Sequence, residues 1–260
     1  MTEFNWFLQT PLDAIIFDCD GTLSQIEGIN YLAGLNGVET QVTALTETAM
    51  SHTGVTRDLY HQRLSRVRPS LQQTMQLAQQ YYKTLSPDVI VLIAAFQKLN
   101  KTLFVISAGI NPAVTLFADK LGIPAHRVFA VDTHYDEHGR YQSYDEYSPL
   151  TDVSGKALII ERIKCQFPHV MFVGDGMNDV EASRGVDRFV GYGGAFFRER
   201  IALLSPFYIK CTSLLPVLAL ALTEQEYRQS PTDLQALFER SVDLLQLSLT
   251  KGANDENSCC

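Results

Sequence analysis

Two pairs of aspartates each follow an apolar run that is typical of a buried strand. Asp18 and Asp20 follow the run Ile-Ile-Phe, and Asp175 and Asp179 lie in Gly-Asp-Gly-Met-Asn-Asp after the run Val-Met-Phe-Val. In an open parallel sheet the carboxyl ends of the strands meet at one edge, where ligands bind. Carboxylates gathered there repel one another unless a cation lies among them, and ligands that are all oxygen favour Mg²⁺. Asp18 and Asp20 are then suited to act as a nucleophile beside an acid in phosphoryl transfer.

Two further polar residues occupy positions from which they can bind an anion. Ser107 follows the run Leu-Phe-Val-Ile, which predicts a strand that ends at this serine and a loop through Ala108 and Gly109 before a helix. The hydroxyl and the amides that follow it can hold phosphoryl oxygens. Lys156 lies where a helix is expected to begin, and a cation there opposes the helix dipole, which indicates a functional demand. Taken alone, a serine in the position of Ser107 is most often a helix or turn cap, and an exposed lysine explains Lys156 equally well.

Alternating strand-like and helix-like segments after about residue 85 predict an α/β fold, a Rossmann-like parallel sheet with helices on both faces. The helix-like runs lie near residues 88–99, 112–121, 155–166 and 178–184. Residues 25–84 have a helical period and predict a helical bundle inserted after the first strand. We therefore expect an α/β core of residues 1–24 and 85–223. A C-terminal segment, 224–260, is expected to contain an amphipathic helix and a disordered tail.

The insert contains two stripes at helical spacing. One predicts a buried helix face and consists of Leu71, Met75, Ala78, Tyr82 and Leu85. The other contains a charge, because Arg63 lies among Leu59, Tyr60, Leu64 and Val67. A guanidinium on an apolar face needs a partner, either structural or a substrate carboxylate, and we favour the substrate. Glu27 carries less information, since acids are common in the first turn of a helix.

Composition limits the classes of function. The chain has 260 residues, and 21 basic against 29 acidic residues give a net charge of −8, which favours a small-molecule substrate and disfavours nucleic acid. The five cysteines form no C-x-x-C pair, so we expect no disulfide framework or zinc site and a cytoplasmic protein. The longest apolar stretches are too short to span a membrane. We expect a monomer or a homodimer.

Four motifs in this order resemble those of the haloacid dehalogenase (HAD) superfamily phosphatases. They are Asp-x-Asp-Gly-Thr-Leu at 18–23, Ser107, Lys156, and Gly-Asp-Gly-x-Asn-Asp at 174–179. Within that superfamily the chain most resembles the phosphoserine phosphatases, through Glu27-Gly28-Ile29, Ala49-Met50 and Arg63-Leu64 in the insert. The resemblance extends from about residue 13 to about residue 222, and it identifies the insert as the helical cap of that family.

The resemblance implies a Mg²⁺-dependent hydrolase of a phosphomonoester, L-phosphoserine, that forms an aspartyl-phosphate on Asp18. Asp20 would protonate the leaving oxygen and then activate the water. The resemblance assigns Mg²⁺ to Asp18, Asp175 and the Asp20 carbonyl, with Asp179 nearby, and the transferring oxygens to Ser107 and Lys156. It assigns the substrate ammonium to Glu27 and the carboxylate to Arg63, and it adds Met50, Ala108, Gly109 and Asn178 to the substrate-binding residues.

Three features depart from the family pattern. Ala108 stands where the family commonly has a glycine, which matters if that residue must adopt positive φ. Ser51 and His52 stand where a glycine usually follows Met50, and Thr56 stands where phenylalanine is usual. We expect these changes to affect the fit of the substrate more than the chemistry.

Two other functions stay open at this point. One is a HAD phosphatase or phosphotransferase that acts on another small phosphomonoester, with an alcohol in place of water as acceptor in the second case. The other is a binding or regulatory protein that keeps the fold without turnover. This second function is disfavoured, because the residues needed for turnover are all present: Asp18, Asp20, Lys156, Asp175 and Asp179.

Overall fold

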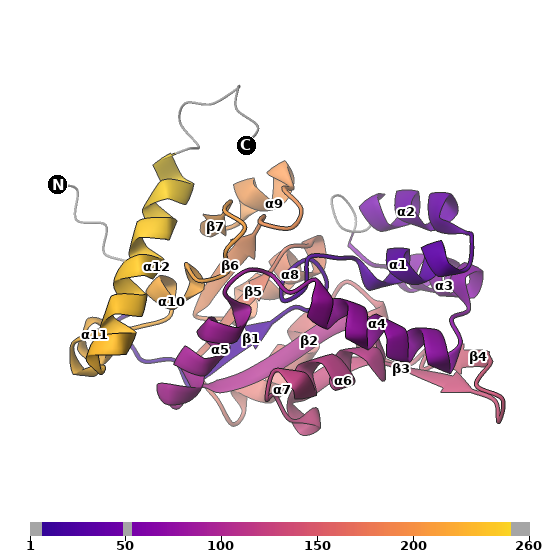
Figure 1. Cartoon of the computed structure of the whole chain (residues 1–260), viewed down its shortest axis with the longest axis horizontal. Coiled ribbons are helices and arrows are strands. Elements are labelled where there is room, and N and C mark those ends of the chain that lie inside the picture. Colours follow the sequence, from indigo (N-terminus) through magenta and orange to yellow (C-terminus); the bar gives the residue numbers. More distant parts are fainter. Residues whose placement is uncertain (1–6, 49–53, 251–260) are drawn as a thin grey trace.

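A seven-stranded sheet forms the centre of the computed structural model, which describes residues 7–48 and 54–250 (Figure 1). The strand order is β4-β3-β2-β1-β5-β6-β7, and neighbouring strands are parallel except for β3 and β4. The strands are β1 Ala14–Phe17, β2 Thr102–Asn111, β3 Val128–Tyr135, β4 Tyr141–Tyr144, β5 Val170–Gly174, β6 Arg188–Tyr192 and β7 Phe207–Ile209. The predicted α/β class is confirmed.

The central strand, β1, is completely buried. Strands covered on both faces need continuous apolar runs, which is why β1 and β5 are recognisable in the sequence. Phe17 at the end of β1 is in register with Val105 of β2 and Val173 of β5. The next residue, Asp18, donates its backbone N–H to the Val173 carbonyl at 2.9 Å. The loops that carry Asp18 and Asp175 therefore leave the sheet side by side.

The side on which successive strands are added to the sheet reverses between β1 and β5. From this point β2 and β3 follow on one side and β5, β6 and β7 on the other. Right-handed crossovers that run in opposite directions place their helices on opposite faces, and the crevice above the reversal is where such sheets bind ligands. The helices of this part are α5 Val89–Lys98, α6 Ala113–Lys120, α7 Gly155–Lys164, α8 Met177–Ala182 and α9 Glu199–Leu204. No described helix is long and apolar enough to cross a membrane.

The predicted strand end at Ser107 is wrong, because β2 continues to Asn111. The register of β2 against β3 shifts between Ile106 and Ile110, so Ser107 lies in an irregular stretch of the strand. Irregularities of this kind redirect side chains beside active sites. The run of apolar residues stops at Ser107 because the sheet edge opens toward a cavity there, while the backbone pairing goes on.

Residues 25–84, which we call the helical insert, follow β1 and precede α5. Their helices are α1 Gly28–Leu35, α2 Glu39–Thr48, α3 Arg57–Val67 and α4 Leu71–Lys83. In Figure 1 they form the indigo and purple helices beside the sheet. The two ends of the insert touch, because Gln25 donates its N–H to the Thr84 carbonyl at 2.8 Å and the hydroxyls of Ser24 and Thr84 are 2.9 Å apart.

The stripe predicted for the last helix of the insert is correct for Ala78, which is buried, and wrong for Met75 and Tyr82. The stripe residues Met75 and Tyr82 are 49% and 40% exposed, whereas α4 buries Thr74, Leu77, Ala78 and Tyr81. Both sets have helical spacing, so the period alone does not choose between them. The observed face brings the Tyr81 ring against Phe117, at 5.4 Å between centroids, and its hydroxyl into the cavity.

The C-terminal segment packs on the core through α12. Its helices are α11 Glu224–Gln229 and α12 Thr232–Thr250, which follow α10 Val217–Leu220. The buried Phe238 ring of α12 stacks on Phe7 at 5.5 Å and contacts Tyr227 at 4.6 Å. The Ser241 hydroxyl accepts from the N–H of Ala219 and donates to the carbonyl of Leu215. The predicted tail lies largely outside the described residues.

We expect Phe238→Ala to lower the free energy of unfolding by about 3 kcal/mol, because it leaves a cavity between α12, Phe7 and Tyr227. Urea denaturation followed by circular dichroism measures the change. Leu247→Ala is the control on the same helix, since Leu247 is 57% exposed, and it should change stability by less than about 0.5 kcal/mol. Equal midpoints for the two variants would contradict the packing of α12 on the core.

Candidate active site

A cavity of about 50 Å³ lies where the carboxyl ends of β1 and β2 and the first turns of α7 and α8 meet the helical insert. The residues singled out in the sequence that line it are Asp18, Asp20, Glu27, Arg63, Ser107, Ala108, Gly109, Lys156, Asn178 and Asp179. Asp175 lies beside Gly176 at its edge. Met50, Ser51 and His52 lie outside the described residues.

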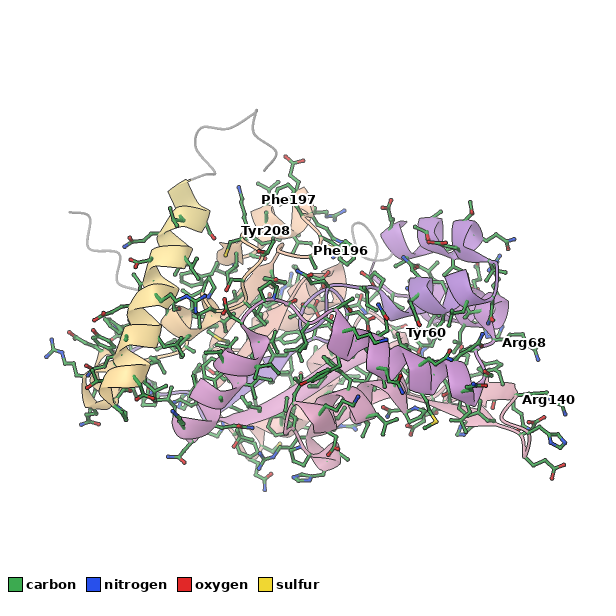
Figure 2. All side chains as sticks on the ribbon, in the orientation of Figure 1. Tyr60, Arg68, Arg140, Phe196, Phe197 and Tyr208 are labelled. Carbon is green, nitrogen blue, oxygen red and sulfur yellow. The ribbon has the colours of Figure 1, made fainter. Side chains whose placement is uncertain are left out.

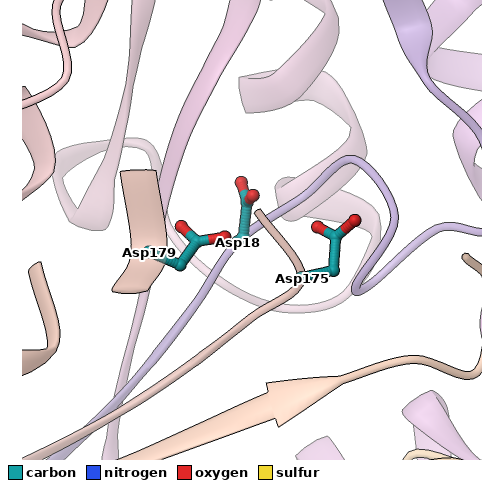
Figure 3. A group of neighbouring side chains, drawn as sticks. All are labelled: Asp18, Asp175 and Asp179. Atoms are coloured by element: carbon teal, nitrogen blue, oxygen red, sulfur yellow. The ribbon is translucent and has the colours of Figure 1, made fainter. Parts of the chain in front are cut away.

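Three buried aspartates form a cluster at the sheet edge (Figure 3). Asp18, Asp175 and Asp179 each place a carboxylate oxygen within 4.8 Å of the others. Burial raises the pKa of Asp18 well above its usual value, and it raises the pKa of Asp175 to about 6 although Arg198 opposes the shift. Three buried carboxylates repel one another, and their oxygens are ligands that a hard divalent cation prefers.

Lys156 lies between two of these aspartates. From the first turn of α7 its Nζ atom is 2.8 Å from the carboxylate of Asp18 and 2.6 Å from that of Asp179. Burial alone would lower the pKa of Lys156, but the carboxylates of Asp179 and Asp18 outweigh it and hold the pKa above its usual value. The lysine therefore stays charged, although it opposes the helix dipole.

Arg198 is a residue of the site that the sequence reasoning missed. Its guanidinium pairs with the carboxylate of Asp175 and donates to Glu27 Oε1 at 2.9 Å. Burial raises the pKa of Glu27 to about 8, with further contributions from the carboxylates of Asp175 and Asp20. Arg198 lies in the loop after β6, whose carboxyl end meets the same sheet edge, and this position was the available signal.

Asp20 is held by three hydrogen-bond donors. Its Oδ1 atom accepts from the N–H of Gly28 at 2.5 Å and from the Tyr81 hydroxyl at 2.8 Å, and its Oδ2 atom accepts from Ser107 Oγ at 3.3 Å. Burial still raises the pKa of Asp20 above its usual value. Tyr81, like Arg198, was missed. A side chain at position 28 would collide with the Tyr81 hydroxyl, so glycine is required there.

The wall formed by the helical insert carries Arg63. Arg63 is 5% exposed, and within the described residues its guanidinium donates to Thr46 Oγ1 at 3.5 Å. Burial lowers its pKa, and the nearby carboxylate of Glu27 opposes this. The insert is tied to the core where the N–H of Val55 donates to Asn178 Oδ1 at 2.7 Å. Asn178 thus contacts the insert while it lines the cavity.

Two of the departures from the family pattern are explained by local structure. Ala108 does not have positive φ, so the part of β2 that follows Ser107 carries no strain from alanine. Thr56 is the N-cap of α3, where its hydroxyl accepts from the N–H of Leu59 at 3.3 Å, and its neighbour Val55 lines the cavity. Neither residue disturbs the groups that gather at the sheet edge.

Comparisons with known proteins agree with this geometry. A family model described as haloacid dehalogenase-like hydrolase matches residues 12–187. The chain is 35% identical over 199 residues to phosphoserine phosphatase of Bos taurus, which covers 76% of this chain and 88% of that protein. It is 30% identical to the chloroplastic phosphoserine phosphatase of Arabidopsis thaliana, over 75% of this chain and 68% of that protein.

Solved structures share the fold. A phosphoserine phosphohydrolase-like protein from Francisella tularensis superposes with a TM-score of 0.69 at 22% identity, covering 77% of this chain and 96% of that one. A structure described as a phospho-aspartyl intermediate analogue of phosphoserine phosphatase gives a TM-score of 0.70 at 21% identity, covering 80% and 98%. At these identities the structures support the architecture alone.

We expect Mg²⁺ in excess to raise the unfolding temperature of the wild-type protein and EDTA to reverse the rise, because an ion that binds only the folded state stabilises it. At about 100 times the dissociation constant the gain is about 2.7 kcal/mol. Asp175→Asn should abolish most of this gain. The control Asp119→Asn, at an exposed position of α6, should retain it in full. An equal response of both variants, measured by differential scanning calorimetry, would rule out this cluster as the ion site.

Proposed function

The chain belongs to the haloacid dehalogenase-like hydrolases, and we propose that it removes the phosphoryl group of O-phospho-L-serine, releasing serine and inorganic phosphate. One observation carries the proposal. A single cavity has Asp18, Asp20 and Lys156 on the sheet side and Glu27 and Arg63 on the side of the insert. The first group is suited to phosphoryl transfer. The second is suited to bind the ammonium and the carboxylate of an amino acid.

In the proposed first step a carboxylate oxygen of Asp18 attacks phosphorus, and the bond between phosphorus and the serine oxygen breaks. Lys156, at 2.8 Å, stabilises the ionised form of Asp18 against the effect of burial. Asp20 gives its proton to the departing serine oxygen, and its raised pKa favours the protonated form that this step needs. The products of the step are an aspartyl-phosphate on Asp18 and neutral serine hydroxyl.

In the second step water attacks phosphorus and the bond between phosphorus and Asp18 breaks. Asp20, now ionised, accepts a proton from the water, which restores both aspartates. Lys156 and Ser107 hold the phosphoryl oxygens during both steps, and Asn178 is in a position to assist from α8.

The proposal includes Mg²⁺ as the resident ion. Asp18 and Asp175 would hold it, with Asp179 beside them, and the Asp20 carbonyl is the further ligand that family resemblance suggests. When bound, the ion supplies positive charge that neutralises the nucleophile and the phosphoryl oxygens as they approach. The burial and the oxygen-only chemistry of the three carboxylates support this choice of ion.

We further propose a cytoplasmic enzyme. Cys19, Cys165 and Cys211 are free thiols among the described residues, as a reducing compartment allows. The chloroplastic relative in Arabidopsis thaliana indicates that the compartment varies among similar proteins.

The proposal predicts phosphate release from phosphoserine that requires Mg²⁺. Asp18→Asn should lower kcat by at least about four orders of magnitude, because no nucleophile remains. A phosphate-release assay that compares phosphoserine, phosphothreonine, phosphoethanolamine and phosphocholine measures both activity and preference. The exposed-site variant Asp119→Asn should keep wild-type activity.

Other outcomes of this assay select the competing functions. Faster turnover of another ester than of phosphoserine would identify a related small-molecule phosphatase. A phosphorylated product after addition of glycerol would identify a phosphotransferase. Inactivity on all four esters in the presence of Mg²⁺ would contradict the proposal and favour a binding or regulatory protein.

A further inference from the structure

Three buried polar side-chain atoms lack a hydrogen-bond partner in the part of the chain that the structure describes. They are Tyr60 Oη, Arg63 Nε and Asn178 Nδ2. All three residues line the same cavity. Buried polar groups are normally paired, so unpaired groups that converge on one cavity indicate a ligand that pairs them.

Tyr60 is the residue of this group to which neither the sequence nor the family resemblance gives a role. It lies on α3 almost one turn before Arg63, on the same helix face, and its side chain is 4% exposed. Figure 2 labels Tyr60 among the side chains of the helical insert. Its ring contacts that of Tyr144 on β4 at 5.2 Å between centroids, and the Arg63 guanidinium carbon lies 5.9 Å from the centroid of the Tyr60 ring. The ring therefore has partners, and only the hydroxyl is left without one.

The groups around the Tyr60 hydroxyl indicate which chemical group of a ligand it binds. Burial raises the pKa of Tyr60, so the phenol stays protonated and can donate. Arg63 is a buried cation with no ion pair in the described residues. A substrate ammonium beside these groups would be repelled by the guanidinium. A carboxylate would accept hydrogen bonds from both Tyr60 and Arg63 and would neutralise the charge of Arg63.

We propose that Tyr60 is a specificity-determining residue whose hydroxyl donates to the substrate carboxylate next to Arg63. The inference rests on the proposed function, and it adds a second donor, the Tyr60 hydroxyl, to the end of the cavity where Arg63 lies. Tyr60 and Arg63 mark the carboxylate end of the cavity on α3. Asn178 marks the phosphoryl end on α8, next to Asp179.

The test is Tyr60→Phe, which removes one oxygen and keeps the ring against Tyr144. With phosphoserine the KM should rise about tenfold or more, since a hydrogen bond to a charged group is lost, while kcat changes by less than about twofold. With phosphoethanolamine, which lacks the carboxylate, kcat/KM should not change. Tyr144→Phe is the matched control, because its hydroxyl faces His61 at 3.4 Å and does not line the cavity, and it should behave like wild type.

A measurement without substrate separates a binding role from a structural one. Because the hydroxyl is unpaired in the free protein, Tyr60→Phe should unfold at the same temperature as wild type or at a higher one. A lower unfolding temperature together with a lower kcat would assign Tyr60 to the structure and overturn the inference.

The kinetic outcomes distinguish the inference from the proposed function. If wild type hydrolyses phosphoserine but Tyr60→Phe leaves its KM unchanged, or shifts phosphoserine and phosphoethanolamine equally, the inference fails and the function stands. If wild type releases no phosphate from phosphoserine, both fail.

Discussion

The crowding of buried carboxylates at the reversal of the sheet is the constraint on which the rest of this structure depends. Asp18, Asp175 and Asp179 are forced together because β1 and β5 are adjacent, parallel and in register. Two cationic side chains, Lys156 and Arg198, neutralise part of their charge and leave a negative excess. Such a cluster destabilises a folded chain unless the surrounding core outweighs it, and the strands that carry it are among the most completely buried segments of the molecule.

The position of the site could be predicted from the sequence because parallel strands have a strong signature. A run that is buried on both faces is continuously apolar, so its end is visible, and topology then places the ends together. Arg63 was recognisable for a related reason, since a charge on an otherwise apolar helix face is conspicuous. The end of β2 was misplaced because the residues stop being apolar at Ser107 while the backbone pairing continues.

Arg198 and Tyr81 could not be found by the same reasoning. Arg198 lies in a loop without periodicity, and its partner Glu27 is 171 positions away in the chain. Tyr81 and Tyr82 occupy competing faces of one helix, and the choice depends on Asp20, which lies 61 positions earlier. A local sequence pattern carries no information about contacts between residues so far apart in the chain. Thr56, in contrast, has a purely local role as the N-cap of α3.

The contact between the two ends of the helical insert gives the protein a modular construction. Gln25 and Thr84 are joined by one backbone hydrogen bond, so the sheet accommodates the whole insert as if it were a short loop. A segment whose ends meet at the same spacing fits there without stretching the core, provided that it brings donors for Asp20. The insert thus begins and ends at one point of the sheet, yet it is coupled to the core, because Gly28 and Tyr81 hold Asp20 and Glu27 pairs with Arg198.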